Sequence, residues 1–237
     1  MIEIFAIPIP KVISHHELEF LMGYNTEPIQ RRIKRCQLQD ERKRKLLGQM
    51  LIRFIILNKF KVTNDNIDFY SNDYGKPYLR GNKNFHFNIS HSGDWVTCAI
   101  NNKPIGVDVE QIKQINIRMF QPFLSPEECK SLNPEKKDAL RHFYELWTYK
   151  ESFIKCIGLG LSIPLDSFTI RFTDRIQVLN KAGDILSRFH FYQYNIDSNY
   201  KLAICSQNPE IDRKIEIVTY EQIYSFFTKI PLVGVKL

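Results

Sequence analysis

The segment Pro104-Ile-Gly-Val-Asp-Val-Glu110 is typical of a strand with two faces of opposite character. Side chains two positions apart lie on the same face of a strand. Asp108 and Glu110 are therefore expected to point together, while Val107 and Val109 pack on the other side. We predict a half-buried strand that presents two carboxylates side by side.

A third carboxylate, Glu151, lies further along the chain in Trp147-Thr-Tyr-Lys-Glu-Ser-Phe-Ile-Lys155. It falls on the apolar stripe of a predicted helix, whose other members are Leu140, Phe143, Tyr144, Trp147 and Ile154. A carboxylate that faces a core is costly unless a cation or a proton compensates its charge. Three carboxylates that converge from a strand and a helix suit Mg²⁺, which completes its shell with water and substrate phosphate.

Each of these carboxylates also has a purely structural interpretation. The pair Asp108 and Glu110 is typical of the solvated face of an antiparallel strand. Glu151 is four residues before Lys155, which is the spacing of an ion pair on a helix surface. In a cleft, the same Lys155 is suited to contact a phosphate as a point charge. The residues alone leave both interpretations open.

The composition bounds the class of protein. The chain has 237 residues, of which 43% are hydrophobic, enough for one domain or two small ones. No continuous apolar run is long enough to span a membrane, and residues 1–10 lack the pattern of a secretion signal. The five cysteines form no C-x-x-C pair, which argues against a zinc site or a disulfide framework. We therefore expect a cytoplasmic protein with reduced thiols and no membrane association.

The formal net charge of +7 is concentrated in one region. Only Asp40 and Glu41 offset a run of cations there, which consists of Arg31, Arg32, Lys34, Arg35, Arg42, Lys43, Arg44, Lys45 and Arg53. Such a run is either a solvated helix face or a surface for a negatively charged partner. Nucleic acid, a phosphorylated small molecule and an acidic protein all remain open from charge alone.

The hydrophobic pattern predicts a similar order of elements twice. The first half is expected to contain a strand at 2–9, a long helix from Pro28 to about Leu57, and short strands at 67–70, 85–89, 95–100 and 105–109. The second half is expected to contain a short helix after Ser125, a long helix over 134–157, strands at 167–172, 175–179, 189–196, 201–206 and 214–219, and a short helix from Tyr220.

A short sequence echo supports this duplication. Phe85-His-Phe87 recurs as Phe189-His-Phe191, each followed by another strand. We therefore predict an α+β fold with two similar, pseudo-symmetric halves, 1–104 and 105–237. Each half is expected to pack a long helix on a small, mainly antiparallel sheet. Asp108 and Glu110 then lie near the boundary between the two halves, where a ligand cleft is expected.

Two further motifs present polar groups next to apolar strands. Tyr74-Gly-Lys-Pro77 is typical of a rigid turn that presents Lys76, although an ordinary loop has the same composition. Phe87-Asn-Ile-Ser-His-Ser92 clusters Ser90 and His91, whose donors suit phosphate oxygens. The chain has no G-x-S-x-G elbow, no P-loop and no G-x-G-x-x-G, so it lacks the signatures of the common hydrolases, P-loop enzymes and Rossmann enzymes.

Taken in order, the motifs Tyr74–Pro77, Phe87–Ser92, Ile105–Glu110 and Trp147–Lys155 resemble the 4'-phosphopantetheinyl transferases of the surfactin-synthetase-activating type. The resemblance covers nearly the whole chain, whose length is similar to that of the two-halved, monomeric members. It implies transfer of the phosphopantetheine arm of coenzyme A to a serine of an apo carrier protein, with adenosine 3',5'-bisphosphate as the other product. The carrier is expected to belong to nonribosomal peptide, polyketide or fatty-acid synthesis.

The resemblance also implies roles for individual residues. Asp108, Glu110 and Glu151 are expected to hold Mg²⁺, with Mn²⁺ as an alternative, on the pyrophosphate. Lys155 is expected to contact that pyrophosphate, and Glu151 to help deprotonate the serine, so these two are the expected catalytic residues. The expected coenzyme A site consists of Lys76, Pro77, Ser90, His91 and Lys155, with Arg44 and one or both of Arg31 and Arg32 near the 3'-phosphate. Where the family often has a polar residue, shortly after the D-x-E, this chain has Ile112.

The chemistry of the residues agrees with this resemblance, because attack of a hydroxyl on a pyrophosphate requires neutralised charge on the transferring phosphoryl group. The exposed apolar residues expected within 112–124 suggest a docking patch for the carrier, and core packing is the alternative. A metal-dependent nuclease or nucleic-acid-binding protein shares the carboxylates and the basic helix, but no nucleic-acid motif is present. A catalytically silent carrier-binding module is the other alternative, and the intact set of carboxylates argues against it.

Overall fold

The computed structural model describes residues 1–231, apart from the side chains of residues 161 and 211–213. The helices are α1 (His15–Met22), α2 (Glu27–Lys34), α3 (Gln39–Phe60), α4 (Pro126–Ser131), α5 (Ala139–Ile157) and α6 (Tyr220–Phe227), with short 3₁₀ turns between some of them. The strands are β1 (Ile2–Pro8), β2 (Phe69–Ser71), β3 (Pro77–Leu79), β4 (His86–Ser92), β5 (Trp95–Asn101), β6 (Ile105–Gln111), β7 (Thr169–Phe172), β8 (Ile176–Leu179), β9 (His190–Tyr194), β10 (Tyr200–Ser206) and β11 (Ile211–Ile217).

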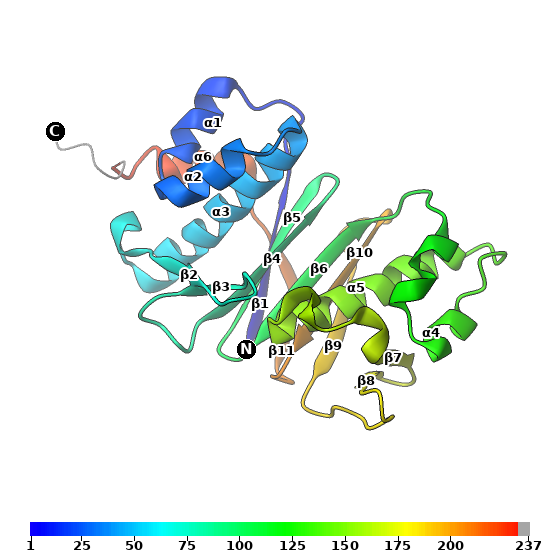
Figure 1. Cartoon of the computed structure of the whole chain (residues 1–237). Coiled ribbons are helices and arrows are strands. Elements are labelled where there is room, and N and C mark those ends of the chain that lie inside the picture. Colours follow the sequence, from blue (N-terminus) through cyan, green and yellow to red (C-terminus); the bar gives the residue numbers. More distant parts are fainter. Residues whose placement is uncertain (232–237) are drawn as a thin grey trace.

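The chain forms two lobes, and each lobe packs one long helix on a small sheet (Figure 1). In the first lobe, α3 covers a sheet with the strand order β11-β1-β5-β4. In the second lobe, α5 covers a sheet with the order β6-β10-β9. Apart from the parallel pair of β1 and β11, neighbouring strands in both sheets are antiparallel. The predicted α+β fold with two similar halves is confirmed.

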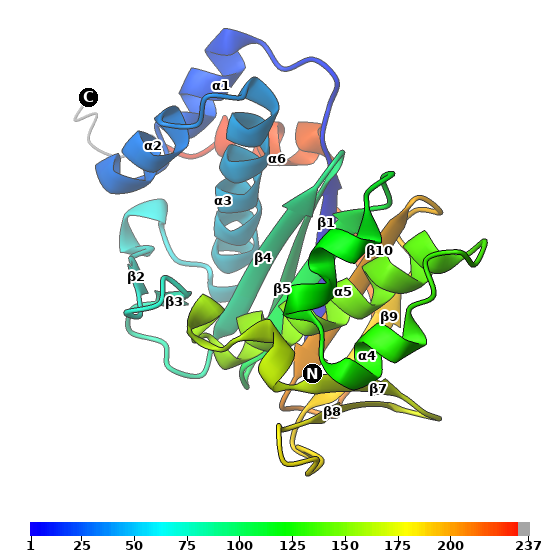
Figure 2. The same ribbon diagram turned by 45° about the vertical axis from the view of Figure 1, so that its right-hand side comes forward.

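The long helices follow from the apolar spacing of their sequences. One face of α3 is buried, and its residues recur at helical intervals: Leu46, Leu47, Met50, Leu51, Ile55 and Ile56. In α5, Phe143, Leu146, Phe153 and Ile154 are buried in the core of the second lobe. Gly158 ends α5 with a φ of 80°, a left-handed conformation that glycine adopts without steric cost. In the turned view of Figure 2, α3 lies beside the sheet of the first lobe, and α5 lies in front of the sheet of the second lobe.

The single helix predicted from Pro28 to about Leu57 is wrong, because the chain breaks between α2 and α3. Arg42 explains the break, since its Nη2 donates to the carbonyl oxygens of Lys34 at 3.2 Å and Cys36 at 3.1 Å. A cation at the end of α2 thus satisfies backbone acceptors that a continuous helix would have used itself. Similarly, α5 begins at Ala139 instead of residue 134, after a turn in which the Asn133 side chain accepts from the backbone of Glu135.

The last segment of the chain returns to the first lobe. Strand β11 pairs with β1, and the buried residues Val218, Tyr220, Ile223 and Phe227 join the core beneath α3. The predicted boundary near residue 104 lies in the turn between β5 and β6, and the second lobe is built mainly from residues 105–206. No helix among residues 1–231 has both the length and the apolar character needed to cross a membrane.

Side chains instead of a backbone ladder join the two sheets. Alternate residues of β4 accept hydrogen bonds from backbone N–H groups of β6, in the pairs Asn88 with Val107, Ser90 with Val109, and Ser92 with Gln111. The donor–acceptor distances are 2.9, 3.3 and 3.1 Å. These side chains satisfy an edge strand that would otherwise leave its N–H groups unpaired in the interior. These contacts between β4 and β6, which we call the seam, hold β6 and its residues Asp108 and Glu110 between the two lobes.

Candidate active site

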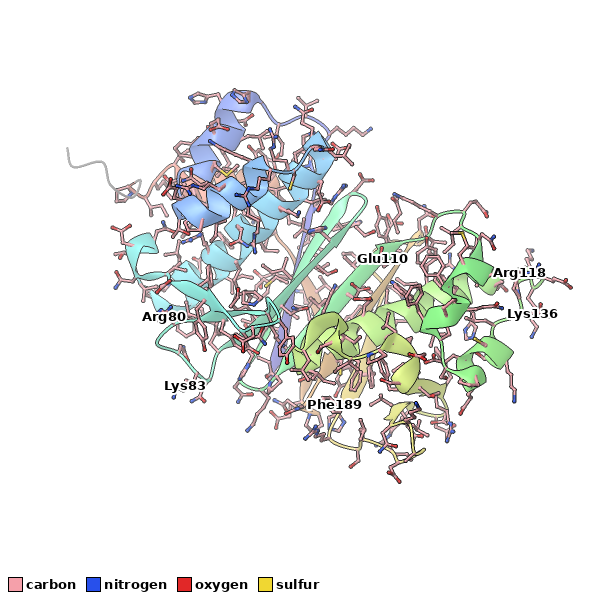
Figure 3. The ribbon with its side chains drawn as sticks, in the orientation of Figure 1. Arg80, Lys83, Glu110, Arg118, Lys136 and Phe189 are labelled. Atoms are coloured by element: carbon pink, nitrogen blue, oxygen red, sulfur yellow. The ribbon has the colours of Figure 1, made fainter. Side chains whose placement is uncertain are left out.

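Strand β6 and helix α5 bring the three predicted carboxylates together. Asp108 and Glu110 point to the same side of β6, as the alternation of the sequence predicts, with Asp108 only 2% exposed. Helix α5 packs directly on β6, since an added Cβ at Gly106 would lie 2.1 Å from the carbonyl oxygen of Ser152. This close approach places Glu151 and Lys155 of α5 beside the strand. Figure 3 shows Glu110 between the two lobes.

Lys155 is the cation among these carboxylates. Its Nζ lies 2.5 Å from Oδ1 of Asp108 and 3.1 Å from Oγ of Ser90. Burial lowers the pKa of Lys155, but the nearby charges of Asp108, Glu151 and Glu110 more than offset this and raise it above its usual value. Lys155 therefore contacts Asp108 and Ser90, and it acts on Glu151 through the electrostatic influence of its charge. All four groups share one electrostatic environment.

The surroundings of Glu110 and Glu151 disfavour their charged forms. Burial, and then the neighbouring charge of Asp108, raises the pKa of Glu110 to about 7. The same two causes, in the same order, raise the pKa of Glu151. Carboxylates whose pKa values are raised by burial and by one another are typical of sites that take a proton or a cation.

The donor set fits a divalent cation with oxygen ligands. Asp108 Oδ2 is buried and has no hydrogen-bond partner among the described residues, so it is a free acceptor inside the cluster. A second cation would also relieve the repulsion that raises the pKa values of Glu110 and Glu151. Within residues 1–231, however, no three His, Cys, Asp or Glu side chains already form a metal cage. Lys155 lies against Asp108 instead, so metal binding requires its ammonium group to move.

A buried ion pair anchors α5 immediately before Glu151. Lys150 Nζ lies 2.7 and 2.6 Å from the two carboxylate oxygens of Glu128 and 3.0 Å from the carbonyl oxygen of Phe168. Both side chains are almost fully buried. Glu128 also accepts from the backbone N–H of Ile170, so the pair is fully hydrogen-bonded. The anchor fixes α5 against α4 and β7, and thereby the position of the next residue.

A chain of hollows runs from the cluster toward the basic helices. Near the cluster, Tyr74, Pro77 and Lys155 line a hollow of about 200 Å³. Pro77 also lines a hollow of about 350 Å³ with Arg32, Lys45 and His91. The same proline and Arg32 border a third hollow of about 420 Å³. A larger hollow of about 870 Å³ lies between β9 and β11, but it includes none of these cations or carboxylates.

Two predicted coenzyme A residues have structural partners in the fold. The ammonium group of Lys76 donates to the carbonyl oxygens of Ile105, Lys155 and Cys156 at 3.0, 2.6 and 3.0 Å. It thus neutralises the C-terminal end of α5, and the same side chain lines the hollow that Lys155 also lines. Ser90 is 6% exposed, and its Oγ donates to Asp108 Oδ1 at 2.9 Å. Its hydroxyl lies against the carboxylates.

The basic run divides into residues that line the hollows and residues that do not. Arg32 lines both of the hollows beside Pro77. Arg31 instead pairs with Glu27 on the outside of α2, and Arg44 pairs with Glu41 and donates to the carbonyl oxygen of Gly93. Our sequence analysis missed Lys45 as a lining residue. Its position in the sequence could have indicated this role, because Lys45 follows Arg44 directly and so lies about 100° further around the same helix.

Comparisons with known proteins identify the family of this chain. The family model of the 4'-phosphopantetheinyl transferase superfamily matches residues 104–205, and a model of the N-terminal region of these transferases matches residues 13–103. The chain belongs to the 4'-phosphopantetheinyl transferase superfamily. The family resemblance drawn from the four motifs is confirmed.

Individual relatives define the type within this superfamily. The 4'-phosphopantetheinyl transferase Sfp of Bacillus subtilis (strain 168) is 36% identical over 222 residues, which are 93% of this chain and 99% of that protein. The 4'-phosphopantetheinyl transferase gsp of Aneurinibacillus migulanus is 36% identical and covers 87% of this chain and 86% of its own length. This chain is therefore an Sfp-type enzyme, which transfers 4'-phosphopantetheine from coenzyme A to apo carrier proteins.

Proposed function

We propose that Asp108, Glu110 and Glu151 hold one Mg²⁺ on the pyrophosphate of coenzyme A, with Mn²⁺ as an alternative. The observation that carries this proposal is the convergence of three carboxylates and Lys155 at one end of a basic chain of hollows. When bound, the ion supplies positive charge that neutralises the transferring phosphoryl group. Lys155 then exchanges its contact with Asp108 for a pyrophosphate oxygen, as a point charge.

Coenzyme A is proposed to lie along the hollows beside Pro77. Its 3'-phosphate is best matched by Arg32, Lys45 and His91, which line the hollow next to the one that Lys155 lines. Burial lowers the pKa of His91, so at neutral pH its ring meets the phosphate mainly as a neutral hydrogen-bond donor. Arg44 and Arg31 remain proposals with less support, because their side chains are engaged elsewhere.

Glu151 is the proposed base for the serine hydroxyl of the carrier. Its pKa is raised, which improves a carboxylate as a proton acceptor near neutral pH. The hydroxyl oxygen attacks the phosphorus of the phosphopantetheine arm, its proton passes to Glu151, and adenosine 3',5'-bisphosphate leaves. The first lobe contributes Arg32 and the second contributes Glu151, so one chain completes the site. We therefore propose a monomer, in the cytoplasm in keeping with its free cysteines.

Mass spectrometry tests the proposed reaction. Purified protein with Mg²⁺ and coenzyme A is expected to add about 340 Da, the mass of the arm on its phosphate, to an apo carrier. A panel of apo carriers from nonribosomal peptide, polyketide and fatty-acid synthases identifies the preferred partner. We expect nonribosomal peptide carriers to be served, because the resemblance of the motifs to transferases of the surfactin-synthetase-activating type implies that class. No adduct on any carrier, with or without Mg²⁺, would count against the proposal.

The carrier is proposed to dock on part of the segment 112–124. The structure divides this segment, because Met119 and Phe123 are 71% and 47% exposed. Phe120, by contrast, packs on Phe143 and Trp147 with ring centroids 4.9 and 5.3 Å away. The exposed pair is therefore the proposed docking patch, and Phe120 is part of the core. Figure 3 shows Arg118, the residue before Met119, at the outer end of the second lobe.

Replacing both Met119 and Phe123 with glutamine is expected to raise KM for the carrier about tenfold. Loss of apolar contact at a docking surface weakens binding, and a tenfold weaker affinity corresponds to about 1.4 kcal/mol of binding free energy. KM for coenzyme A should stay unchanged, because neither Met119 nor Phe123 lines the hollows proposed for coenzyme A. Steady-state kinetics with each substrate varied in turn measures both constants. Val12→Gln is the matched control, since Val12 is an 85% exposed apolar residue of the first lobe; an unchanged carrier KM in the double variant contradicts the docking patch.

A further inference from the structure

The side chains that join β4 to β6 do more than close the seam. Asn88 uses its side chain only to accept from the backbone of β6 among the hydrogen bonds of residues 1–231. Ser90 and Ser92 accept in the same way, but each also donates its hydroxyl hydrogen to a carboxylate. Ser90 donates to Asp108 Oδ1 at 2.9 Å, and Ser92 donates to Glu110 Oε2 at 2.7 Å. Each carboxylate of the D-x-E therefore has its own serine on the neighbouring lobe.

The geometry of Ser92 fixes the direction of its hydrogen bond. A hydroxyl has one hydrogen, and its lone pairs accept from other donors. The backbone N–H of Gln111 is 3.1 Å from Oγ, so it engages a lone pair and the hydrogen is left for Glu110. A single hydrogen bond to Oε2 restrains the carboxylate and leaves Oε1 available.

The turn that follows Ser92 is itself tightly held. Gly93 has a φ of 55°, and an added Cβ would lie 2.3 Å from the hydroxyl of Tyr200. Tyr200 accepts from the backbone of Asp94 at 2.9 Å, and Arg44 Nη1 donates to the carbonyl oxygen of Gly93 at 3.1 Å. Contacts from both lobes thus fix the end of β4. Ser92 is a rigid support, because its backbone has little freedom to move.

We propose that Ser92 is a positioning residue that holds Glu110 in the orientation required for the divalent cation. This inference rests on the proposed metal site. Ligand carboxylates are oriented by hydrogen bonds from outside the coordination shell, and loss of such a partner typically weakens metal binding by about 10–100-fold. The support comes from the first lobe while the carboxylate belongs to the second, so correct assembly of the lobes and correct metal geometry depend on one side chain.

The test compares Ser92→Ala with Ser92→Thr and Asn88→Ala. The probe is Mn²⁺, titrated in the presence of coenzyme A and followed by electron paramagnetic resonance, which reports metal affinity without catalysis. We expect Ser92→Ala to raise the Kd for Mn²⁺ at least about tenfold, and Ser92→Thr, which keeps the hydroxyl, to stay within about threefold of the natural protein. Asn88→Ala removes the matched seam contact without a carboxylate partner. Because Asn88 also lines the hollows proposed for coenzyme A, all titrations are run at saturating coenzyme A. The Asn88→Ala variant should then have a lower melting temperature but an unchanged affinity for Mn²⁺.

The outcomes separate this inference from the function on which it rests. If Asp108→Asn abolishes Mn²⁺ binding while Ser92→Ala binds as tightly as the natural protein, Ser92 has no positioning role and the metal site stands. Equal weakening in Ser92→Ala and Asn88→Ala also overturns the inference, because loss of the seam alone would then explain the effect. If the natural protein binds no Mn²⁺ with coenzyme A present, the metal site and the role of Ser92 both fail.

Discussion

Replacing Glu151 with glutamine is expected to lower kcat/KM for phosphopantetheinyl transfer by at least about 1000-fold, or about 4 kcal/mol of transition-state stabilisation. Glutamine keeps the shape of the side chain but loses the negative charge of the proposed metal ligand and base. The fold should remain intact, because burial and the charge of Asp108 already disfavour an ionised Glu151. Removing this charge relieves repulsion, so the melting temperature should stay the same or rise slightly.

The control for this prediction lies on the same helix. Glu145 pairs with Lys201 at 3.0 Å and has no place in the proposed site, so Glu145→Gln should stay within about twofold of the natural activity. Both rates are measured by mass spectrometry of the modified carrier, and both melting temperatures by circular dichroism. A Glu151→Gln variant that retains more than about a tenth of the natural kcat/KM would show that this carboxylate is dispensable.

The second large effect is expected from Gly106→Ala. An added Cβ would lie 2.1 Å from the carbonyl oxygen of Ser152 and 2.4 Å from the backbone nitrogen of Cys156. Both neighbours are backbone atoms of α5, so they can yield only if the whole helix moves away from β6. We expect a loss of about 3 kcal/mol in the free energy of unfolding, at the upper end of the usual cost of overpacking. For a chain of this size, the melting temperature should fall by about 6–12 °C.

The same substitution should also reduce activity, because displacement of α5 separates Glu151 and Lys155 from Asp108. The matched control is Gly48→Ala, in the middle of α3. Its Cβ would lie 3.1 Å from Cγ2 of Ile89, a side-chain atom, and alanine favours the helix by about 1 kcal/mol over glycine. We expect the unfolding free energy of this control to change by less than about 1 kcal/mol. If Gly106→Ala is as stable as Gly48→Ala, the direct packing of α5 on β6 contributes little to the free energy of unfolding.

Much of the active site was predictable because two local periodicities place it. The alternation of a strand puts Asp108 and Glu110 on one side, and the spacing of a helix puts Glu151 and Lys155 one turn apart. Neither periodicity depends on distant contacts, so both features appear in the structure as expected. The order of the motifs was sufficient to indicate the family, which the comparisons confirm.

The features that were not predictable depend on contacts that follow neither the helical nor the strand period of the sequence. Lys76 in a glycine–proline turn looks like a phosphate ligand, but which acceptors it meets is decided by the end of α5. The break between α2 and α3 depends on Arg42, which reaches back to carbonyl groups that a simple pattern assigns to one helix. The partner of Ser92 follows from the side-by-side placement of two strands that share no backbone ladder. In each case a tertiary contact overrides a local preference.

Anomalous diffraction from crystals grown with coenzyme A and Mn²⁺ shows directly where the divalent cation binds. We predict a single strong Mn²⁺ peak about 2.1–2.2 Å from oxygen atoms of Asp108, Glu110 and Glu151, next to the pyrophosphate, with the ammonium group of Lys155 moved off Asp108. A Mn²⁺ peak elsewhere, or bound coenzyme A whose pyrophosphate lies away from these carboxylates, would contradict this prediction.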